Sequence, residues 1–554
     1  MRVNRNVFIP MRDGTKLCAD VFLPEGEGPF PALVALSPYG KEIQTLQMPP
    51  QPLGSPVYER AIEAGDPQYL TDHGYVHVIA DLRGIGKSED VYRGWMSDEG
   101  RDGHDLVEWA AAQSWCDGKV GMVGVSYYGA VQLMVAATRP PHLKAIMPFN
   151  APTDFYREGT HHGGIRHVFF NLIYKMKTTG ASVSTLVEAL EPDQLDDLIA
   201  KLAADPDLQM YPEIYNAAID PKRVPNFFDI LAQPFDGPFY WERSAYTKYA
   251  DIQVPAYCGS GWWAFAHMHL RGAFQNFKGI KAPTKLYIES RVEAAAPMDQ
   301  KYNAEVVRWY DYWLKGVDNG IMDEPPIQIH VRGSGFREER EWPLARTEWT
   351  KFHLQRWSAL STDPEPVDGY PDTFVQQPPY ITASVQRADY VTPPLLAPLE
   401  IVGPAALYLY ADIDAEDTNW IVALADIAPN GAAVELTRGF LKASHRALDK
   451  ERSQPYLPFH PHREAEQVPP GKVIEYAIEL SPIANVFRPG HRLRLSVMAM
   501  DHKFYPPTDP ELGGGHLPWH VCRNAVVTHR VHHGPATPSH LLLPVIPRAG
   551  GKPQ

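Results

Sequence analysis

The chain has 554 residues, too many for a single hydrophobic core, so we expect two or three domains. Hydrophobic residues make up 44% and charged residues 21% of it, the balance of an ordinary globular protein. The net charge of −14 argues against nucleic acid or an anionic membrane as a partner, because both are bound through clustered Lys and Arg.

The chain carries no sign of export, membrane insertion or metal binding. No stretch approaches the roughly 18 apolar residues that span a bilayer, and the first residues lack the apolar core of a signal peptide. The four cysteines are scattered with no C-x-x-C pair. This favours reduced, buried thiols over a disulfide framework or a zinc site, with a single buried disulfide as the alternative. We therefore predict a cytoplasmic protein without a cofactor.

The first part of the chain alternates strands with helices. The segments VFIPM and KLCADVFLP flank Asp13-Gly14, and Asp-Gly is a strong hairpin signal. Three apolar runs follow, PALVALSPYG, YVHVIADLRG and VGMVGVS, and such runs suit strands buried on both faces of a sheet. Between the last two, Leu106, Trp109 and Ala110 stand at helical spacing. Strand, helix and strand in this order predict a parallel sheet with right-handed crossovers.

The pattern changes after residue 152. Residues 153–245 are helical in pattern, and we expect them to form a cap inserted over the sheet. The earlier pattern resumes with strands in IQVPAYCGSG and TKLYIES and a helix in AEVVRWYDYWLKG, which Gly316 ends. Residues 1–152 and 246–324 are therefore predicted to form one α/β domain.

From residue 325 onward the chain consists of short alternating segments separated by Gly, Pro and Asp. These segments are IQIHVRG, LYLYADI, NWIVALADI, VIEYAIEL, LRLSVMAM and AVVTHRVHH. Such a pattern is typical of a β-sandwich or jelly roll. We predict a jelly-roll domain over residues 325–554.

The string GVSYYG at residues 124–129 stands where a buried strand ends and a helix begins. A sharp turn there pushes the Ser126 hydroxyl out of the sheet and places the Tyr127 N–H at a helix N-terminus, where it can stabilise an oxyanion. The strict form of this motif has Gly where the chain has Tyr128. The context predicts a serine nucleophile at Ser126, against the alternative of an ordinary strand-to-helix turn.

Further segments occur in one family's order along nearly the whole chain. They are MRDGTKLCADVFLP, PYGK, ADLRGIGKSE, DGHDLVEWAAAQSWCDGKVGMVGVSYYG, RWYDYWLKGVDNG and SHLLLPVIP. With them the chain resembles the family of cocaine esterase, α-amino-acid ester hydrolases and X-Pro dipeptidyl-peptidases. The resemblance implies an α/β-hydrolase domain with a helical cap and a C-terminal jelly roll. It also implies cleavage of an ester or amide through an acyl-serine, with the Tyr39 phenol and the Tyr127 N–H holding the oxyanion.

The chain departs from that family at two positions. The family's acid follows a Gly-Trp-Tyr-Asp string, but here residues 261–264 read Gly-Trp-Trp-Ala, so Ala264 takes the place of the acid. The family's histidine follows the next strand, where this chain has Glu293. A serine at its ordinary pKa is a poor nucleophile without a base. The base must therefore come from elsewhere, or the chemistry differs.

Three explanations stay open. Another histidine can substitute, and His267 is the first candidate because it lies about one helical turn beyond Ala264. Alternatively, burial raises the pKa of Glu293 or Glu289, so that one of them serves as base or as orienting group. The further candidate histidines are His269, His161 and His162. In the third explanation the protein is a non-hydrolytic enzyme (a cyclase, isomerase or lyase) on this scaffold, or only binds a carbonyl ligand.

The sequence as a whole predicts a serine hydrolase for a small-molecule ester or amide. Ser126 attacks the carbonyl, Tyr39 and Tyr127 hold the oxyanion, and His267 or Glu293 handles the proton. Hydrolases of this kind that carry a jelly roll are often dimeric, so a homodimer is a further expectation.

Overall fold

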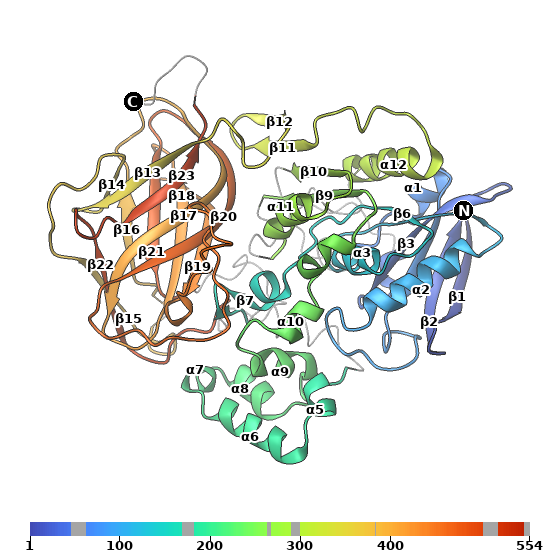
Figure 1. Ribbon diagram of the computed structural model, residues 1–554, viewed down its shortest axis with the longest axis horizontal. Helices are drawn as coiled ribbons and strands as arrows, with labels where there is room; N and C mark the ends of the chain where they lie inside the picture. Colours follow the sequence, from blue (N-terminus) through green and yellow to red (C-terminus); the bar gives the residue numbers. More distant parts are fainter. Residues whose placement is uncertain are drawn as a thin grey trace.

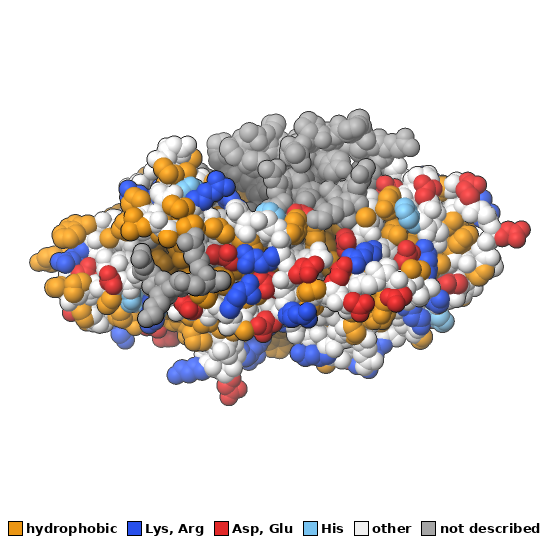
Figure 2. Space-filling view, turned by 90° about the horizontal axis from the view of Figure 1, so that it is seen from above, with side chains coloured by type: hydrophobic (Ala, Val, Ile, Leu, Met, Phe, Trp, Pro, Cys, Tyr) orange, Lys and Arg blue, Asp and Glu red, His pale blue; other side chains and the backbone are white. Residues whose placement is uncertain are grey.

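The protein consists of an α/β part, a group of small helices and a β part (Figure 1). The computed structural model describes residues 1–45, 63–168, 182–262, 268–289, 300–382, 384–501 and 519–547. None of the helices in these ranges combines the length and the apolar composition needed to cross a lipid bilayer. On the face shown in Figure 2, acidic and basic side chains are interspersed.

A ten-stranded sheet forms the α/β part, in the order β1-β2-β4-β3-β5-β6-β9-β10-β11-β12. The strands are β1 (Arg2–Pro10), β2 (Lys16–Leu23), β3 (Phe30–Ser37), β4 (Val76–Asp81), β5 (Cys116–Met122), β6 (Leu143–Ile146), β9 (Ala256–Gly261), β10 (Thr284–Glu289), β11 (Ile327–Val331) and β12 (Gly335–Glu339). From β4 to β11 every neighbouring pair is parallel. The predicted hairpin of β1 and β2 is antiparallel and turns at Gly14, whose φ is +91°.

Apolar runs become central strands because both faces of the sheet are covered. In β3, Val34 packs in one hydrophobic cluster and Leu33 and Ala35 in another. The first cluster contains residues of the helices α2 (Glu99–Ala111), α3 (Tyr127–Ala137) and α11 (Leu270–Gly279). The second contains residues of α1 (Pro67–Asp72) and α12 (Gln300–Lys315). The predicted parallel sheet with helices on both faces is confirmed.

One strand lies in a different sheet from the one we expected. We predicted that IQIHVRG opens the jelly roll, but it forms β11 and pairs in parallel with β10. This prediction was wrong, because β11 lies next to the edge of the sheet and its residues alternate between buried and half-buried. An alternating pattern at such a position resembles that of an antiparallel strand with one wet face.

The segment between β6 and β9 is largely helical, as predicted. It contains a π-helical turn, η2 (Phe155–Thr160), and the short strands β7 (His161–His162) and β8 (Ile165–Arg166). The helices are α5 (Thr185–Ala189), α6 (Pro192–Ala203), α7 (Pro206–Gln209), α8 (Pro212–Ile219), α9 (Pro225–Ala232), α10 (Pro238–Glu242) and the 3₁₀ helix η3 (Ala245–Asp251). From α6 to α10 each helix begins with proline, whose fixed φ suits the first helical position. The helices share a small core of their own.

The β part is a sheet that closes on itself, because β17 pairs with β20 and also with β23. Its strands are β13 (Glu348–Gln355), β14 (Ala359–Ser361), β15 (Asp372–Gln376), β16 (Arg387–Val391), β17 (Leu399–Ile413), β18 (Asn419–Ile427), β19 (Ala433–Lys442), β20 (Ile474–Phe487), β21 (Arg492–Met498), β22 (Val527–His532) and β23 (His540–Val545). Its closed core includes Trp420 and Tyr476, both fully buried. This closed β-barrel architecture fits the predicted jelly roll.

The cysteines have the state that the sequence predicted. Cys18, Cys116, Cys258 and Cys522 are all buried and free. Within the described ranges, no three His, Cys, Asp or Glu side chains are grouped so that they could hold a metal ion.

A buried chain of hydrogen bonds links the segment between β6 and β9 to the β part. His520 Nδ1 lies 2.8 Å from Asp501 Oδ2, His520 Nε2 lies 2.9 Å from His162 Nδ1, and His162 Nε2 lies 3.1 Å from the Glu158 carbonyl oxygen. Burial lowers the pKa of His162 to about 3, so its ring is neutral at neutral pH.

Candidate functional site

The turn from β5 to α3 carries Ser126 in a strained conformation. Ser126 has φ +59° and ψ −116°, a region that residues other than glycine rarely adopt. The turn is held by hydrogen bonds from the Ser126 N–H to the Phe149 carbonyl (2.9 Å) and from the Ala130 N–H to the Ser126 carbonyl (2.9 Å). Ser126 itself is half-buried. The predicted strand-to-helix turn is confirmed.

Two glycines of the motif make this turn possible. Gly124 has φ +118°, and a Cβ there would lie 2.8 Å from the Glu63 carbonyl oxygen. At Gly129 a Cβ would lie well inside van der Waals contact with the Phe149 carbonyl oxygen. The helix therefore approaches the neighbouring backbone more closely than any side chain would allow.

The substitution Gly129→Ala is expected to destabilise the fold by about 1–3 kcal/mol, because the new methyl group meets backbone rather than a flexible side chain. Urea unfolding would measure the change. Gly369→Ala is the matched control, since a Cβ at Gly369 would lie 3.4 Å from its nearest neighbour, an ordinary contact. Equal losses in the two variants, or none in Gly129→Ala, would contradict the close approach described above.

The hydroxyl of Ser126 meets a histidine. Ser126 Oγ lies 3.2 Å from His269 Nε2, within hydrogen-bond reach. His269 is buried at the N-cap position of α11, shortly after β9. A serine hydroxyl beside an imidazole is the arrangement that activates serine as a nucleophile.

The other residues considered from the sequence are placed differently. His267, Glu293 and Ala264 lie outside the described residues. Glu289 is buried at the end of β10 and accepts the Tyr287 hydroxyl at 2.6 Å.

The remaining two candidate histidines have other polar contacts. His161 Nδ1 lies 3.0 Å from Thr160 Oγ1, and His162 bonds to His520 in the chain described above. Of the candidate histidines in the described ranges, His269 is the one that forms a hydrogen bond with Ser126.

Tyr39 lies beside the Ser126 turn. It follows β3, and its ring makes edge contacts with the rings of Tyr127 and Tyr128 at centroid distances of 5.9 and 6.0 Å. Its N–H donates to Ser37 Oγ at 3.1 Å. The predicted pair Tyr39 and Tyr127 is thus brought together next to Ser126.

Comparison with known proteins identifies the family. The family model for the X-Pro dipeptidyl-peptidase (S15 family) matches residues 13–291. The model for the X-Pro dipeptidyl-peptidase C-terminal non-catalytic domain matches residues 319–542. The chain belongs to the S15 family. Its family and its relatives show that the protein is a serine hydrolase that acts on ester or amide bonds.

Related proteins match nearly the whole length of this chain. It is 26% identical to cocaine esterase from Rhodococcus sp., over 99% of each chain. A CocE/NonD family hydrolase from Staphylococcus aureus has 24% identity and a TM-score of 0.78, covering 98% of this chain and 94% of its own. An aminopeptidase from a marine sediment Thaumarchaeota archaeon has 18% identity and a TM-score of 0.76, covering 98% and 97%. The predicted family and fold are confirmed, and these comparisons give no support to the non-hydrolytic alternative.

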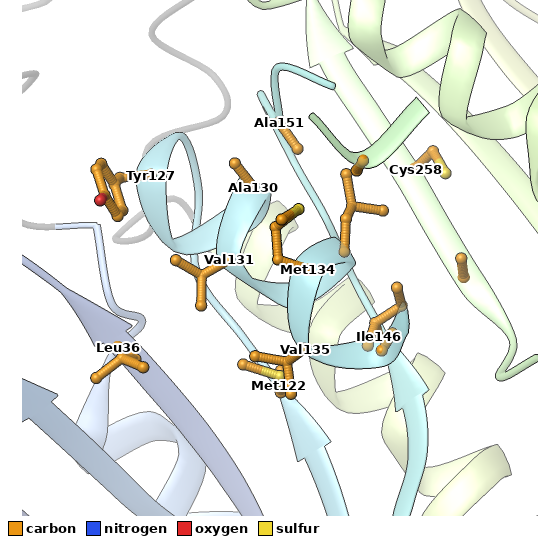
Figure 3. Packing of buried hydrophobic residues seen from close by; sticks show 14 of the residues in the cluster. Leu36, Met122, Tyr127, Ala130, Val131, Met134, Val135, Ile146, Ala151 and Cys258 are labelled. Carbon is orange, nitrogen blue, oxygen red and sulfur yellow. The ribbon is translucent and has the colours of Figure 1, made fainter. Parts of the chain in front are cut away.

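The helix α3, which begins directly after Ser126, is buried along its length in the hydrophobic core. In Figure 3, Val135 lies against Met122 of β5, and Tyr127 lies at the opposite end of the helix. The N–H groups of a first helical turn have no acceptor within the helix, and they form the positive end of the helix dipole. The Tyr127 N–H is thereby suited to a negatively charged oxygen.

The first turn of α11 is fixed by a partly buried arginine. Arg271 Nε donates to Glu479 Oε1 of β20 at 3.0 Å, and Arg271 Nη1 lies 3.4 Å from Glu158 Oε1. The other Glu158 oxygen accepts the Thr153 N–H at 2.7 Å. Burial raises the pKa of Glu158 to about 8. Because Arg271 lies two residues after His269, these bonds hold the start of the helix that presents the imidazole.

Two of the cavities among the described residues lie between the helical segment and the β part. One, of about 490 Å³, is lined by groups that include Arg157, Trp241 and Phe459. The other, of about 320 Å³, is lined by groups that include Arg166 and Lys442. Neither cavity has Ser126 or His269 in its lining, so neither belongs to the candidate site.

Proposed function

We propose that this hydrolase cleaves an ester or amide of a small molecule through an acyl-serine at Ser126, with His269 as general base. The 3.2 Å contact between Ser126 Oγ and His269 Nε2 carries the proposal. We assign the base to His269 because, among the candidates that the structure describes, it is the one that contacts the serine. A positioned histidine is the commonest general base in enzymes.

The geometry supports a two-step acyl transfer. His269 Nε2 accepts the hydroxyl proton while Ser126 Oγ forms a bond to the carbonyl carbon, whose oxygen becomes negative. The Tyr127 N–H and the Tyr39 phenol donate hydrogen bonds to that oxygen. The oxyanion then collapses, and His269 gives the proton to the departing alcohol or amine. Water attacks the acyl-serine in the same way, and Ser126 recovers its proton when the acid leaves.

The architecture supports several further proposals. We keep residues 153–245 as a cap over the site and residues 1–152 and 246–324 in the catalytic domain, to which β11 and β12 also belong, so that the jelly roll begins at β13. The names of cocaine esterase and the archaeal aminopeptidase support small esters and peptide-like amides as the first substrates to try. The cytoplasmic location and the homodimer stay predictions from the sequence.

A fluorophosphonate probe tests the proposed function. An activated serine attacks phosphorus and displaces fluoride, so we expect one label per chain, located on Ser126 by mass spectrometry. Heat-unfolded protein is the control and should not react, because the Ser126–His269 contact is lost on unfolding. Absence of labelling in the folded protein, or a label on another residue, would refute the acyl-serine.

A further inference from the structure

The side chain of Tyr127 is fully buried and contacts both polar and aromatic groups. Its hydroxyl donates to Glu99 Oε1 and lies 3.0 Å from the Tyr92 hydroxyl. Its ring makes edge contacts with Trp95 at a centroid distance of 4.6 Å and with Tyr39 at 5.9 Å. Tyr127 and Glu99 are both buried. The residue whose N–H faces the oxyanion is thus held through its side chain.

Glu99 is a carboxyl group prepared to receive that hydroxyl. It stands in the first position of α2, where its Oε1 accepts the Met96 N–H at 3.0 Å and its Oε2 accepts the Asp98 N–H at 2.9 Å. The positive end of the helix dipole favours a negative charge there. Two backbone donors fix both oxygens, so Glu99 is a rigid anchor for the Tyr127 hydroxyl.

We propose that Glu99 is a positioning residue of the oxyanion site. Through its hydrogen bond to the Tyr127 hydroxyl, Glu99 fixes the position of the Tyr127 N–H and of the Tyr127 ring that Tyr39 contacts. The inference rests on the proposed function, since it assigns Glu99 to the same oxyanion. Stabilisation of an oxyanion depends on donors held in place before the charge develops. Loss of the anchor lets the first residue of α3 shift, and small shifts of such donors lower the rate.

The charge of Glu99 is expected to matter as well as its shape. Burial raises the pKa of Glu99 to about 7, against the hydrogen bonds from Tyr127 and the backbone. The charged or titratable groups that face it are Asp98 on its own helix, Tyr92, Tyr127 and Arg243 after α10. Above pH 7 the carboxylate only accepts, so it fixes the direction of the Tyr127 O–H. Below pH 7 the neutral carboxyl also donates, and that direction is no longer unique.

Substitution Glu99→Gln tests the proposal with p-nitrophenyl acetate as substrate and phenylboronic acid as a mimic of the tetrahedral oxyanion. At pH 8 we expect kcat to fall about tenfold to a hundredfold with little change in KM, and boronic acid affinity to fall by a similar factor. Since glutamine resembles the neutral carboxyl, the ratio of wild-type to variant kcat should shrink toward one below pH 7. Protonation of His269 affects both proteins and cancels in that ratio.

Further variants separate positioning from stability. Tyr127→Phe removes the same hydrogen bond without a new buried amide and should give a similar loss, and the double variant should lose no more than either single one. The control is Tyr75→Phe, which removes a partly buried hydrogen bond of 2.6 Å to Asp311 Oδ1. Tyr75 directly precedes β4, at the amino end of the parallel strands, whereas Ser126 follows the carboxyl end of β5. Unchanged kcat in Glu99→Gln and Tyr127→Phe, or an equal loss in Tyr75→Phe, would overturn the proposal. Absence of fluorophosphonate labelling in the wild type would instead overturn the acyl-serine mechanism.

Discussion

Substitution His269→Ala is expected to lower kcat by about four to six orders of magnitude, the loss typical when the base of a serine nucleophile is removed. The reason is that His269 Nε2 lies 3.2 Å from Ser126 Oγ and is placed to take its proton. The substrate should still bind, so KM should change far less than kcat. Steady-state hydrolysis of p-nitrophenyl acetate and the rate of fluorophosphonate labelling would both report the loss.

Three other substitutions give this prediction its contrast. His104→Ala is the control, because His104 is a half-buried histidine of α2 whose Nδ1 bonds to Thr138 Oγ1 at 3.0 Å. It should leave kcat unchanged. His267→Ala and Glu293→Gln test the two residues first considered from the sequence. If one of them abolishes turnover while His269→Ala remains active, the base is that residue and our assignment to His269 is wrong.

Substitution Asp501→Asn is expected to lower the free energy of unfolding by about 3–5 kcal/mol, because it removes a buried carboxylate that pairs with two side chains. Asp501 is buried, and its Oδ2 lies 2.8 Å from His520 Nδ1 and 3.5 Å from Arg438 Nη1. The asparagine leaves the Arg438 guanidinium without this counterion and weakens the acceptor that the His520 ring faces. Urea unfolding followed by circular dichroism at neutral pH would measure the change.

An exposed pair of the same chemistry is the matched control. Glu108 lies 2.7 Å from His142 Nδ1, and both side chains are partly exposed. Glu108→Gln should therefore cost less than about 1 kcal/mol. Against the effect of burial, His520 holds the pKa of Asp501 below its ordinary value of 3.8. The contribution of Asp501 is thus present above pH 3.8 and is lost as the pH falls through its folded-state pKa. Similar losses in the two variants at neutral pH would contradict a stabilising role of the buried Asp501 carboxylate.

Much of the fold could be predicted because its elements carry strong local signals. The runs of β3 and β4 are mostly apolar, since helices cover both faces of the sheet, and the helices α6 to α10 each begin with a proline. The prediction failed at β11, where a parallel strand near an edge has the alternation of an antiparallel one. The strands that pair with β11 decide to which sheet it belongs, and a local sequence pattern does not show which strands those are.

The Ser126 turn could be predicted for a similar reason, since strand, glycines and helix adjoin one another in sequence. The partner of Ser126 could not, because the contact with His269 spans 143 residues. His269 was considered, but behind His267, whose spacing from Ala264 suggested a shared helix face. The one local signal was that His269 directly precedes the helix α11, at its N-cap. The bond between Glu99 and Tyr127 had no signal in the sequence, as it also joins distant segments.

The start of α11 links the two modules of this protein. Within three residues it presents His269 to the serine and ties Arg271 to Glu479 of the β-barrel. A domain described in its relatives as non-catalytic therefore supports the helix that carries the imidazole. Exchange of the barrel for one lacking this glutamate would therefore remove a support of the imidazole while leaving every catalytic residue unchanged.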